Sequence, residues 1–403
     1  MVDAVARTSD EIGPDMAALA VDGPPPLRAA CLDGAGALVA YRDHCRTALF
    51  APPQNPLWVE CWARHCNDDV IVALLARDGR TVLALALEIV TEGGVVTARF
   101  VGGSHANGNF PAISAHLDPA IAVAELTLLT DAIIRARPDI DLIRLERLVD
   151  DFEGVVNPLR LLPGLQSPNP SLAVNLSGGF DTVLSRASAK RKKKKHRYQT
   201  RKFEAAGGMR RFRATTGAET GRILDDFFAM KALRFATMGI RDVFADPGVP
   251  AFFRDLFASA LEEARPSFVL DALEVGGKLR AITGNSLTLS SLVCEFGAIA
   301  EDELAFASPG EFLFFESIRD ACAEGFAVYD FSVGDEPYKR LWCDLETRQT
   351  DVMLPFGAKG HAARLLIATT ARAKRFVKSN RYLWEGVKRL RRRPQTEPAD
   401  RDD

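Results

Sequence analysis

One order of predicted elements occurs twice in this chain of 403 residues. Each copy consists of a β-hairpin, a third strand, a helix and a closing strand. The elements of the first copy are expected at residues 70–90, 95–101, 120–137 and 140–148, and those of the second at 268–287, 291–300, 308–324 and 327–333. Because the copies are about 200 residues apart, the sequence predicts a tandem repeat of one fold.

A hairpin followed by a strand–helix–strand crossover gives a mixed sheet with helices on both faces. The expected fold class is therefore α/β, or α+β with a mixed sheet. The composition, 47% hydrophobic and 26% charged, is typical of a globular protein, and the length favours two domains. The expected segments are a disordered N-terminus at 1–30, domains at 31–176 and 177–360, a basic helical tail at 361–393 and a disordered end at 394–403.

The sequence carries no targeting or metal-binding signal. Asp3, Asp10 and Glu11 are unlike a secretory leader, and no apolar run reaches the ~18 residues of a membrane span. The seven cysteines, an odd number without metal-type spacing, indicate reduced thiols and no metal site. These features favour a cytoplasmic protein.

Two further segments give local predictions. Trp58 and Trp62 recur at helical spacing, so they are expected in the core of a helix over residues 57–66. Four prolines between residues 158 and 170 predict a linker region that ends at Leu172–Leu176.

The turn Ser308-Pro309-Gly310 precedes the predicted helix Glu311–Glu324, which Gly325 ends. A strand followed by a glycine-containing turn at a helix N-terminus is a phosphate-binding arrangement, because free amides and the helix dipole face the anion. The same three residues are also an ordinary helix start. Both interpretations stay open from this turn alone.

The most charged stretch lies between the copies. Ten of the residues in Lys190–Lys202 are basic, and Gly207-Gly208 ends the helix expected over 188–206. This helix is interpreted either as a solvated surface helix or as a site for phosphate, nucleic acid or an acidic substrate.

A second basic segment lies at the end of the chain. His361–Arg393 holds eleven Lys or Arg and one Glu, with an apolar side that includes aromatic residues. Such a basic amphipathic helix suits a peripheral contact with a membrane surface, here the inner membrane, or an acidic partner. The alternative is a helix packed on its own domain.

Three segments together resemble a known family. They are Leu176–Asp181 leading into Ser188 and the basic run, Phe306–Leu313, and Tyr329–Lys339. In this order they resemble GNAT-superfamily acetyltransferases of the CelD type, which are linked to cellulose or other polysaccharide biosynthesis. The resemblance covers roughly residues 35 to 370. It implies tandem GNAT-like (acyl-CoA N-acyltransferase) domains, as in Fem-type transferases. The basic helix is then a family feature, so a nucleic-acid partner is not expected.

The resemblance implies an acyl-CoA donor, with acetyl-CoA expected as co-substrate. The donor's pyrophosphate would lie at Ser308 and Gly310, against the amides of Glu311 and Phe312, with Lys339 as a further phosphate ligand. The usual Gln/Arg-x-x-Gly-x-Gly form is absent here. The first copy has Asp118-Pro119 at the equivalent place, so it is predicted not to bind CoA.

Acyl transfer from a thioester needs a base for the acceptor and an acid for the leaving thiolate. Glu295 is the leading base candidate, as a carboxylate on a strand face expected to be apolar with Val293 and Ile299. Asp330 is a second base or a structural partner. Tyr338 follows the closing strand, where many GNAT enzymes place the acid. Each residue also has an ordinary interpretation, as a salt-bridged sheet residue or a packed tyrosine.

Nearby groups extend the predicted site. Asp335 and Glu336 follow the closing strand and are candidates for holding a cationic acceptor, or for a solvated turn. No Ser-His-Asp or Cys-His pattern is found, which favours direct transfer in a ternary complex.

The main hypothesis is thus a CoA-dependent acyltransferase acting on an amine or hydroxyl of a sugar, a polysaccharide precursor or another small molecule. The second is a Fem-like transferase that uses aminoacyl-tRNA, with Lys190–Lys202 on the RNA backbone. The third is a non-enzymatic adaptor of a polysaccharide synthesis system.

Overall fold

The computed structural model describes residues 26–114, 121–186 and 188–379, with side chains to residue 370. The first half contains β1 (Arg28–Asp33), α1 (Gly34–Cys45), β2 (Ala48–Leu49), α2 (Pro56–His65), β3 (Val70–Arg77), β4 (Arg80–Glu92), β5 (Val95–Phe100), β6 (Ala112–Ser114), α3 (Val123–Ala136), β7 (Leu142–Leu148), β8 (Asp151–Phe152), β9 (Val155–Val156) and β10 (Gly164–Asn175).

The second half repeats this order after two additional helices. It contains α4 (Gly179–Arg186), α5 (Ala189–Ala205), β11 (Met209–Arg213), α6 (Gly217–Met238), α7 (Val249–Ala260), β12 (Phe268–Val275), β13 (Lys278–Leu287), β14 (Ser291–Ile299), α8 (Pro309–Ala323), β15 (Val328–Val333), α9 (Pro337–Arg340), β16 (Leu345–Pro355) and α10 (Gly357–Ser379). The predicted hairpins, third strands, helices and closing strands of both copies are therefore confirmed within the described residues.

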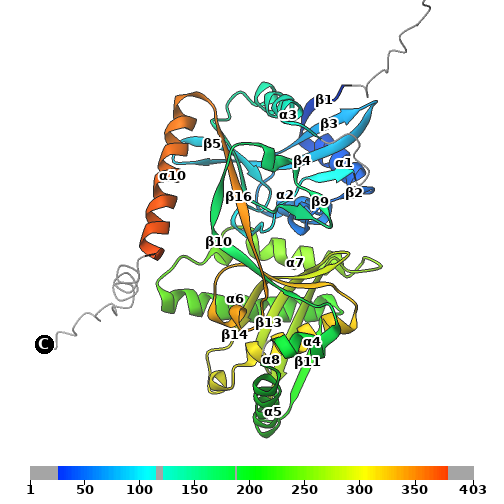
Figure 1. Ribbon diagram of the computed structural model, residues 1–403, viewed down its shortest axis with the longest axis vertical. Coiled ribbons are helices and arrows are strands. Elements are labelled where there is room, and N and C mark those ends of the chain that lie inside the picture. The colour runs from blue at the N-terminus through cyan, green and yellow to red at the C-terminus, as the bar shows by residue number, and fades with distance from the viewer. Residues whose placement is uncertain (1–25, 115–120, 187, 380–403) are drawn as a thin grey trace, which may run out of the picture.

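One large mixed sheet runs through both halves, and its main path has the order β1-β3-β4-β5-β7-β16-β10-β15-β14-β13-β12-β11. The halves exchange their last strands. β16, from the end of the chain, pairs with β7 of the first half, and β10 pairs with β15 of the second. β10 and β16 also pair with each other, and Figure 1 shows them crossing from one half to the other. This exchange joins the two sheets through backbone hydrogen bonds.

Much of the segment that was expected to be a linker forms the strand β10 instead. Pro168 and Pro170 lie inside it, at a register shift between Gln166 and Pro170 where the pairing with β16 is irregular. A proline has no N–H to donate to a neighbouring strand. At a bulge a residue is left unpaired, so that hydrogen bond is not required there. β1 is a second difference, because it begins at Arg28, inside the segment expected to be disordered. Of the residues 1–30 that were expected to be disordered, residues 1–25 lie outside the described part of the chain.

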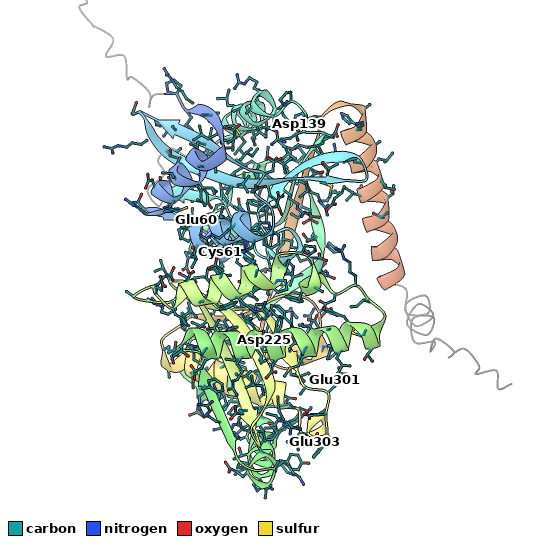
Figure 2. All side chains as sticks on the ribbon, turned by 180° about the vertical axis from the view of Figure 1, so that it is seen from behind. Glu60, Cys61, Asp139, Asp225, Glu301 and Glu303 are labelled. Atoms are coloured by element: carbon teal, nitrogen blue, oxygen red, sulfur yellow. The ribbon has the colours of Figure 1, made fainter. Side chains whose placement is uncertain are left out.

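Aromatic packing joins the halves on the other side. Trp58 of α2 is buried as predicted, and its ring centroid lies 4.9 Å from that of Phe252 on α7. His65 Nε2 lies 2.8 Å from a carboxylate oxygen of Asp255, also on α7. Figure 2 shows this face, with α2 marked by Glu60 and Cys61 and α6 marked by Asp225. The second half therefore packs against the first through α7.

The basic tail begins as α10, which packs on β16 and lies along one side of the molecule (Figure 1). Leu365 and Leu366 on this helix are exposed. The tail's residues from 380 onward lie outside the described part of the chain, and so do the expected disordered residues 394–403. Within the described residues, no helix combines the length and the apolar character that crossing a membrane requires.

Candidate functional site

The parallel strands β14 and β15 separate near their middle. They pair over three residue pairs that end at Val293 and Asp330. Beyond this point β14 continues beside β13 only, as far as the pair Ile299 and Ala281. α8 starts where β14 ends, since a Cβ on Gly310 would lie 2.7 Å from Ile299 Cγ2. The two strands thus form a V whose open end faces the N-terminus of α8.

A β-bulge at Glu295 reverses which side chains of β14 point to each face of the sheet. Cys294 pairs with Asn285 and Phe296 with Gly284, so Glu295 is an extra residue without a partner in register. Before the bulge, Leu292 and Cys294 belong to the core beneath α8. After it, Phe296 belongs to the core beneath α6 and α7. The expectation that Glu295 shares one face with both Val293 and Ile299 was therefore wrong, because the bulge interrupts the alternation.

Only one oxygen of the Glu295 carboxylate has a hydrogen-bond partner among the described residues. Its Oε1 accepts a 2.5 Å hydrogen bond from Ser286 Oγ, whereas its Oε2 is buried without a partner. The pKa of Glu295 is raised to about 8, mainly by burial; the hydrogen bond from Ser286 lowers it, and the nearby carboxyl of Asp330 adds to the rise. A carboxylate with such a pKa can take up a proton near neutral pH.

Asp330 lies at the apex of the V. Its Oδ1 accepts a 2.6 Å hydrogen bond from the Ser332 amide, and burial raises its pKa. The same amide hydrogen bond and the charge of Lys339 act in the opposite direction. Two neighbouring carboxyls whose pKa values are raised by burial favour a state that retains a proton. The predicted pair Glu295 and Asp330 is therefore brought together.

Tyr338 lies on α9, just after β15. Its ring stacks on Phe314 of α8 at a centroid distance of 5.3 Å, and the ring of Phe331 lies 6.0 Å away. The residue keeps 38% of its surface exposed. Burial of the hydroxyl raises its pKa, so the phenol stays protonated at neutral pH. It can therefore act as a proton donor at the edge of the V.

Lys339 has a different environment from the one expected of a phosphate ligand. The residue is buried, and its Nζ lies 2.9 Å from Glu336 Oε2 and 2.9 Å from the Val333 carbonyl oxygen. These contacts fold the loop after β15 back onto the strand. Asp335 is instead paired with Arg340, at 2.5 Å. Lys339 and the two acidic residues thus shape this loop together.

The first turn of α8 has few uncommitted amides. Ser308 has a φ of 56°, and its carbonyl accepts hydrogen bonds from the amides of Glu311 and Phe312. Pro309 has no N–H to offer. The Glu311 side chain pairs with Lys195, and Phe312 is buried. The predicted phosphate site at Ser308, Gly310, Glu311 and Phe312 therefore has less backbone capacity than its sequence indicated.

The corresponding V in the first half is filled by its own chain. β5 and β7 pair over Thr97 to Arg99, and then Asn109 forms a parallel bridge with Leu148. The Asn109 amide donates to the Arg147 carbonyl at 2.9 Å, and the Asn109 carbonyl accepts from the Val149 amide at 3.2 Å. No described segment occupies the equivalent place between β14 and β15. Asp118-Pro119, on which the sequence contrast depended, lies outside the described residues.

Sequence reasoning missed two residues near the V. Ser286 touches Glu295, but a serine in a hairpin strand gives no signal before the register is known. Lys231 lies on α6, and its Nζ is 5.4 Å from the ring centroid of Phe244. Burial lowers the pKa of Lys231 to about 8. A lysine among the phenylalanines of α6 was visible in the sequence and could have been singled out.

Comparisons with known proteins agree with this architecture. Residues 190–340 match the family described as acetyltransferase (GNAT) domain. The C-terminal domain of a putative lysylphosphatidylglycerol synthetase from Agrobacterium fabrum is similar, with a TM-score of 0.50 and 12% identity over 82% of this chain and 96% of that one. FemX is similar with a TM-score of 0.50 and 10% identity, over 80% and 97%. A comparison with curated proteins finds no match.

A third structure, a tandem GNAT protein from the clavulanic acid biosynthesis pathway, matches with a TM-score of 0.46 and 12% identity, over 82% of this chain and 98% of that one. The chain has a mixed α/β fold in which the first half repeats the order of elements of the second, and the second half carries the GNAT domain match. These likenesses show the fold alone. The narrower CelD-type resemblance stays a prediction.

Proposed function

We propose that the second half transfers an acyl group from acyl-CoA, with acetyl-CoA the expected donor, to an amine or hydroxyl acceptor. The observation that carries this proposal is the open V between β14 and β15, with the half-satisfied carboxylate of Glu295 on its bulge. The equivalent V of the first half is closed by Asn109, so that half serves as a scaffold. The acceptor class is a sugar, a polysaccharide precursor or another small molecule.

Glu295 acts as the base in this proposal. It takes the proton from the acceptor's N–H or O–H as the acceptor atom bonds to the thioester carbonyl carbon. The C–S bond then breaks, and the Tyr338 hydroxyl gives its proton to the leaving thiolate. Before the next turnover Glu295 gives its proton to solvent and Tyr338 takes one up from solvent, so each residue returns to its starting state. General acid–base help of this kind contributes about 10²–10⁴-fold in rate.

Asp330 is a positioning residue in this mechanism. The Ser332 amide and the charge of Lys339 favour the ionised form of Asp330, and the charge of Asp330 in turn raises the pKa of Glu295. Lys339 and Glu336 hold the loop that carries Tyr338. The basic tail, residues 361–393, stays a candidate for peripheral contact with a membrane, and a cytoplasmic location remains the expectation.

Calorimetric titration of the full chain with acetyl-CoA tests the donor. We expect binding in the micromolar range or tighter, and release of free CoA when an acceptor amine or aminosugar is added. Glu295→Gln should bind acetyl-CoA as the wild type does but release CoA far more slowly. A protein that shows no heat with acetyl-CoA at millimolar concentration would rule out this donor.

The aminoacyl-tRNA alternative places the Lys190–Lys202 run on RNA. Part of that run faces inward instead, since His196 stacks on Phe312 of α8 at 4.6 Å and Gln199 is buried. Lys193 and Lys194 remain exposed. RNA binding that weakens steeply with salt, in a protein inert to acyl-CoA, would favour that alternative.

A further inference from the structure

A basic cavity of about 260 Å³ opens beside the first turn of α8. Its walls come from the end of α4, the start of α5, Glu311 of α8 and the chain after α9. None of the residues assigned to proton transfer lines it. The sequence singled out the basic run of α5 without assigning it a ligand, and this cavity is where part of that run converges.

The cavity holds an excess of positive charge. Five basic side chains line it against two carboxylates, those of Glu311 and Asp344. Asp344 is paired with Arg186 at 2.8 Å, and Glu311 is paired with Lys195. Both acidic groups are therefore already neutralised. Among the described residues, Arg191 and Lys192 have no carboxylate partner within the cavity.

Lys192 is unusual among the described lysines because it is buried but forms no ion pair within contact distance. Only 9% of its surface is exposed, and its Nζ lies 3.4 Å from the ring centroid of Trp342. No carboxylate or carbonyl oxygen of the described residues accepts a hydrogen bond from it. Burial lowers the pKa of Lys192 to about 8; the charge of Glu311 acts in the opposite direction, and those of Arg191 and Lys195 act in the same direction as burial. Because the Lys192 ammonium lines the cavity and has no ion-pair contact, an anion that enters the cavity would pair with it.

The cavity is fixed relative to the proposed donor site. Gln199 of α5 donates to the Ala307 carbonyl at 2.8 Å and to the Ser308 carbonyl at 3.0 Å. His196 Nε2 lies 2.7 Å from Glu316 of α8. α5 is therefore docked on the turn where a donor's phosphates are expected. That turn itself has few free amides, so side chains would have to supply the missing donors.

We propose that this cavity binds the phosphate groups of a nucleotide, with Lys192 and Arg191 as its principal ligands. Naming the nucleotide as the adenosine bisphosphate part of the acyl donor rests on the proposed function. The anion site itself rests on the cavity's charge and on the buried Lys192. Phosphate recognition would thus move from a glycine-rich backbone turn to the side chains of α5.

The test measures binding of adenosine 3′,5′-bisphosphate and of CoA to the full chain by calorimetry. Lys192→Met keeps the apolar contact with Trp342 and removes the charge. Lys194→Met removes the same charge from an exposed position of the same helix, so it controls for net charge. We expect both ligands to lose about 10- to 100-fold in affinity with Lys192→Met, and about twofold or less with Lys194→Met. Lys192→Arg should retain most of the affinity.

The outcomes separate this proposal from the proposed function. If CoA binds wild type and Lys192→Met equally while both unfold at the same temperature, the anion site is overturned and the acyltransferase stands. If the bisphosphate binds through Lys192 but no acyl-CoA is turned over with any acceptor, the anion site stands and the acyltransferase falls. Binding that an RNA oligonucleotide achieves and the bisphosphate does not would overturn the nucleotide-donor assignment.

Discussion

Ser286 donates a 2.5 Å hydrogen bond to Glu295, although its partner in the sheet register is Val293. The bulge brings these two side chains together by adding one residue to β14. A buried serine hydroxyl therefore holds one oxygen of the proposed base, and the other oxygen has no hydrogen-bond partner among the described residues. This relationship makes the site sensitive to changes in either residue.

Replacing Glu295 with Gln should reduce acyl transfer without loss of the fold. The amide oxygen of Gln can still accept from Ser286, but it cannot take up a proton. We expect kcat to fall about 10²–10⁴-fold, while the Kd for acetyl-CoA stays within about threefold of the wild type. Release of CoA, followed with a thiol reagent, measures the rate. Wild-type turnover in this variant would remove Glu295 from the mechanism.

The pH dependence of kcat/KM should follow the ionisation of Glu295. With the pKa of Glu295 raised to about 8, kcat/KM should increase with pH below 8 and level off above it. The hydrogen bond from Ser286 lowers that pKa, so Ser286→Ala should shift the profile to higher pH. Ser114→Ala, in the first half, is the matched control and should leave the profile unchanged. A shift to lower pH in Ser286→Ala contradicts the assigned contact.

Stability should change with pH in the direction set by the same carboxyl. Its folded pKa, about 8, exceeds its unfolded value of 4.5, so the folded state holds the proton more tightly. The stabilisation is complete below pH 4.5 and is lost as pH rises through 8. Glu295→Gln should therefore gain about 1–4 kcal/mol in unfolding free energy relative to wild type between pH 5 and pH 9. Urea titrations at both pH values measure this, and a constant difference contradicts it.

The repeated order of elements was predictable because local patterns determine it. The Asp-Gly and Gly-Gly turns define the hairpins, and helix boundaries follow from caps and prolines. The exchange of β10 and β16 was not predictable in this way. Pairing across the halves depends on contacts far apart in sequence, and the prolines of β10 masked its strand character.

The candidate site was predictable in its residues more than in its geometry. Glu295, Asp330 and Tyr338 lie around one V, and their roles in proton transfer stay a prediction. The bulge that re-aims Glu295 adds one residue and leaves no clear mark in the pattern. The burial of Lys192 was hidden for another reason, because a run of lysines gives no sign of which one is buried.

Asn109 should matter for stability rather than for donor binding. The residue is 3% exposed, accepts from Gln54 Nε2 at 2.8 Å and donates to the Glu146 carbonyl at 2.7 Å. Asn109→Ala leaves both partners unsatisfied, so we expect a loss of about 1–3 kcal/mol in urea unfolding. Thr127→Ala on the exposed side of α3 should cost much less. Acetyl-CoA affinity should stay unchanged, and a tenfold loss in folded protein would mean that the first half takes part in binding.

Gly310 is required where α8 meets the end of β14. A Cβ at this position would lie 2.7 Å from Ile299 Cγ2, so Gly310→Ala forces the first turn of α8 away from the strand. We expect a loss of about 1–3 kcal/mol in stability and a weaker Kd for CoA, since the turn no longer lies beside the cavity of Lys192. Ile299→Ala removes the colliding methyl group. In the double variant Gly310→Ala should therefore cost less than it does alone, and a double-mutant cycle in urea measures this coupling. Strictly additive losses would mean that the clash does not decide the effect.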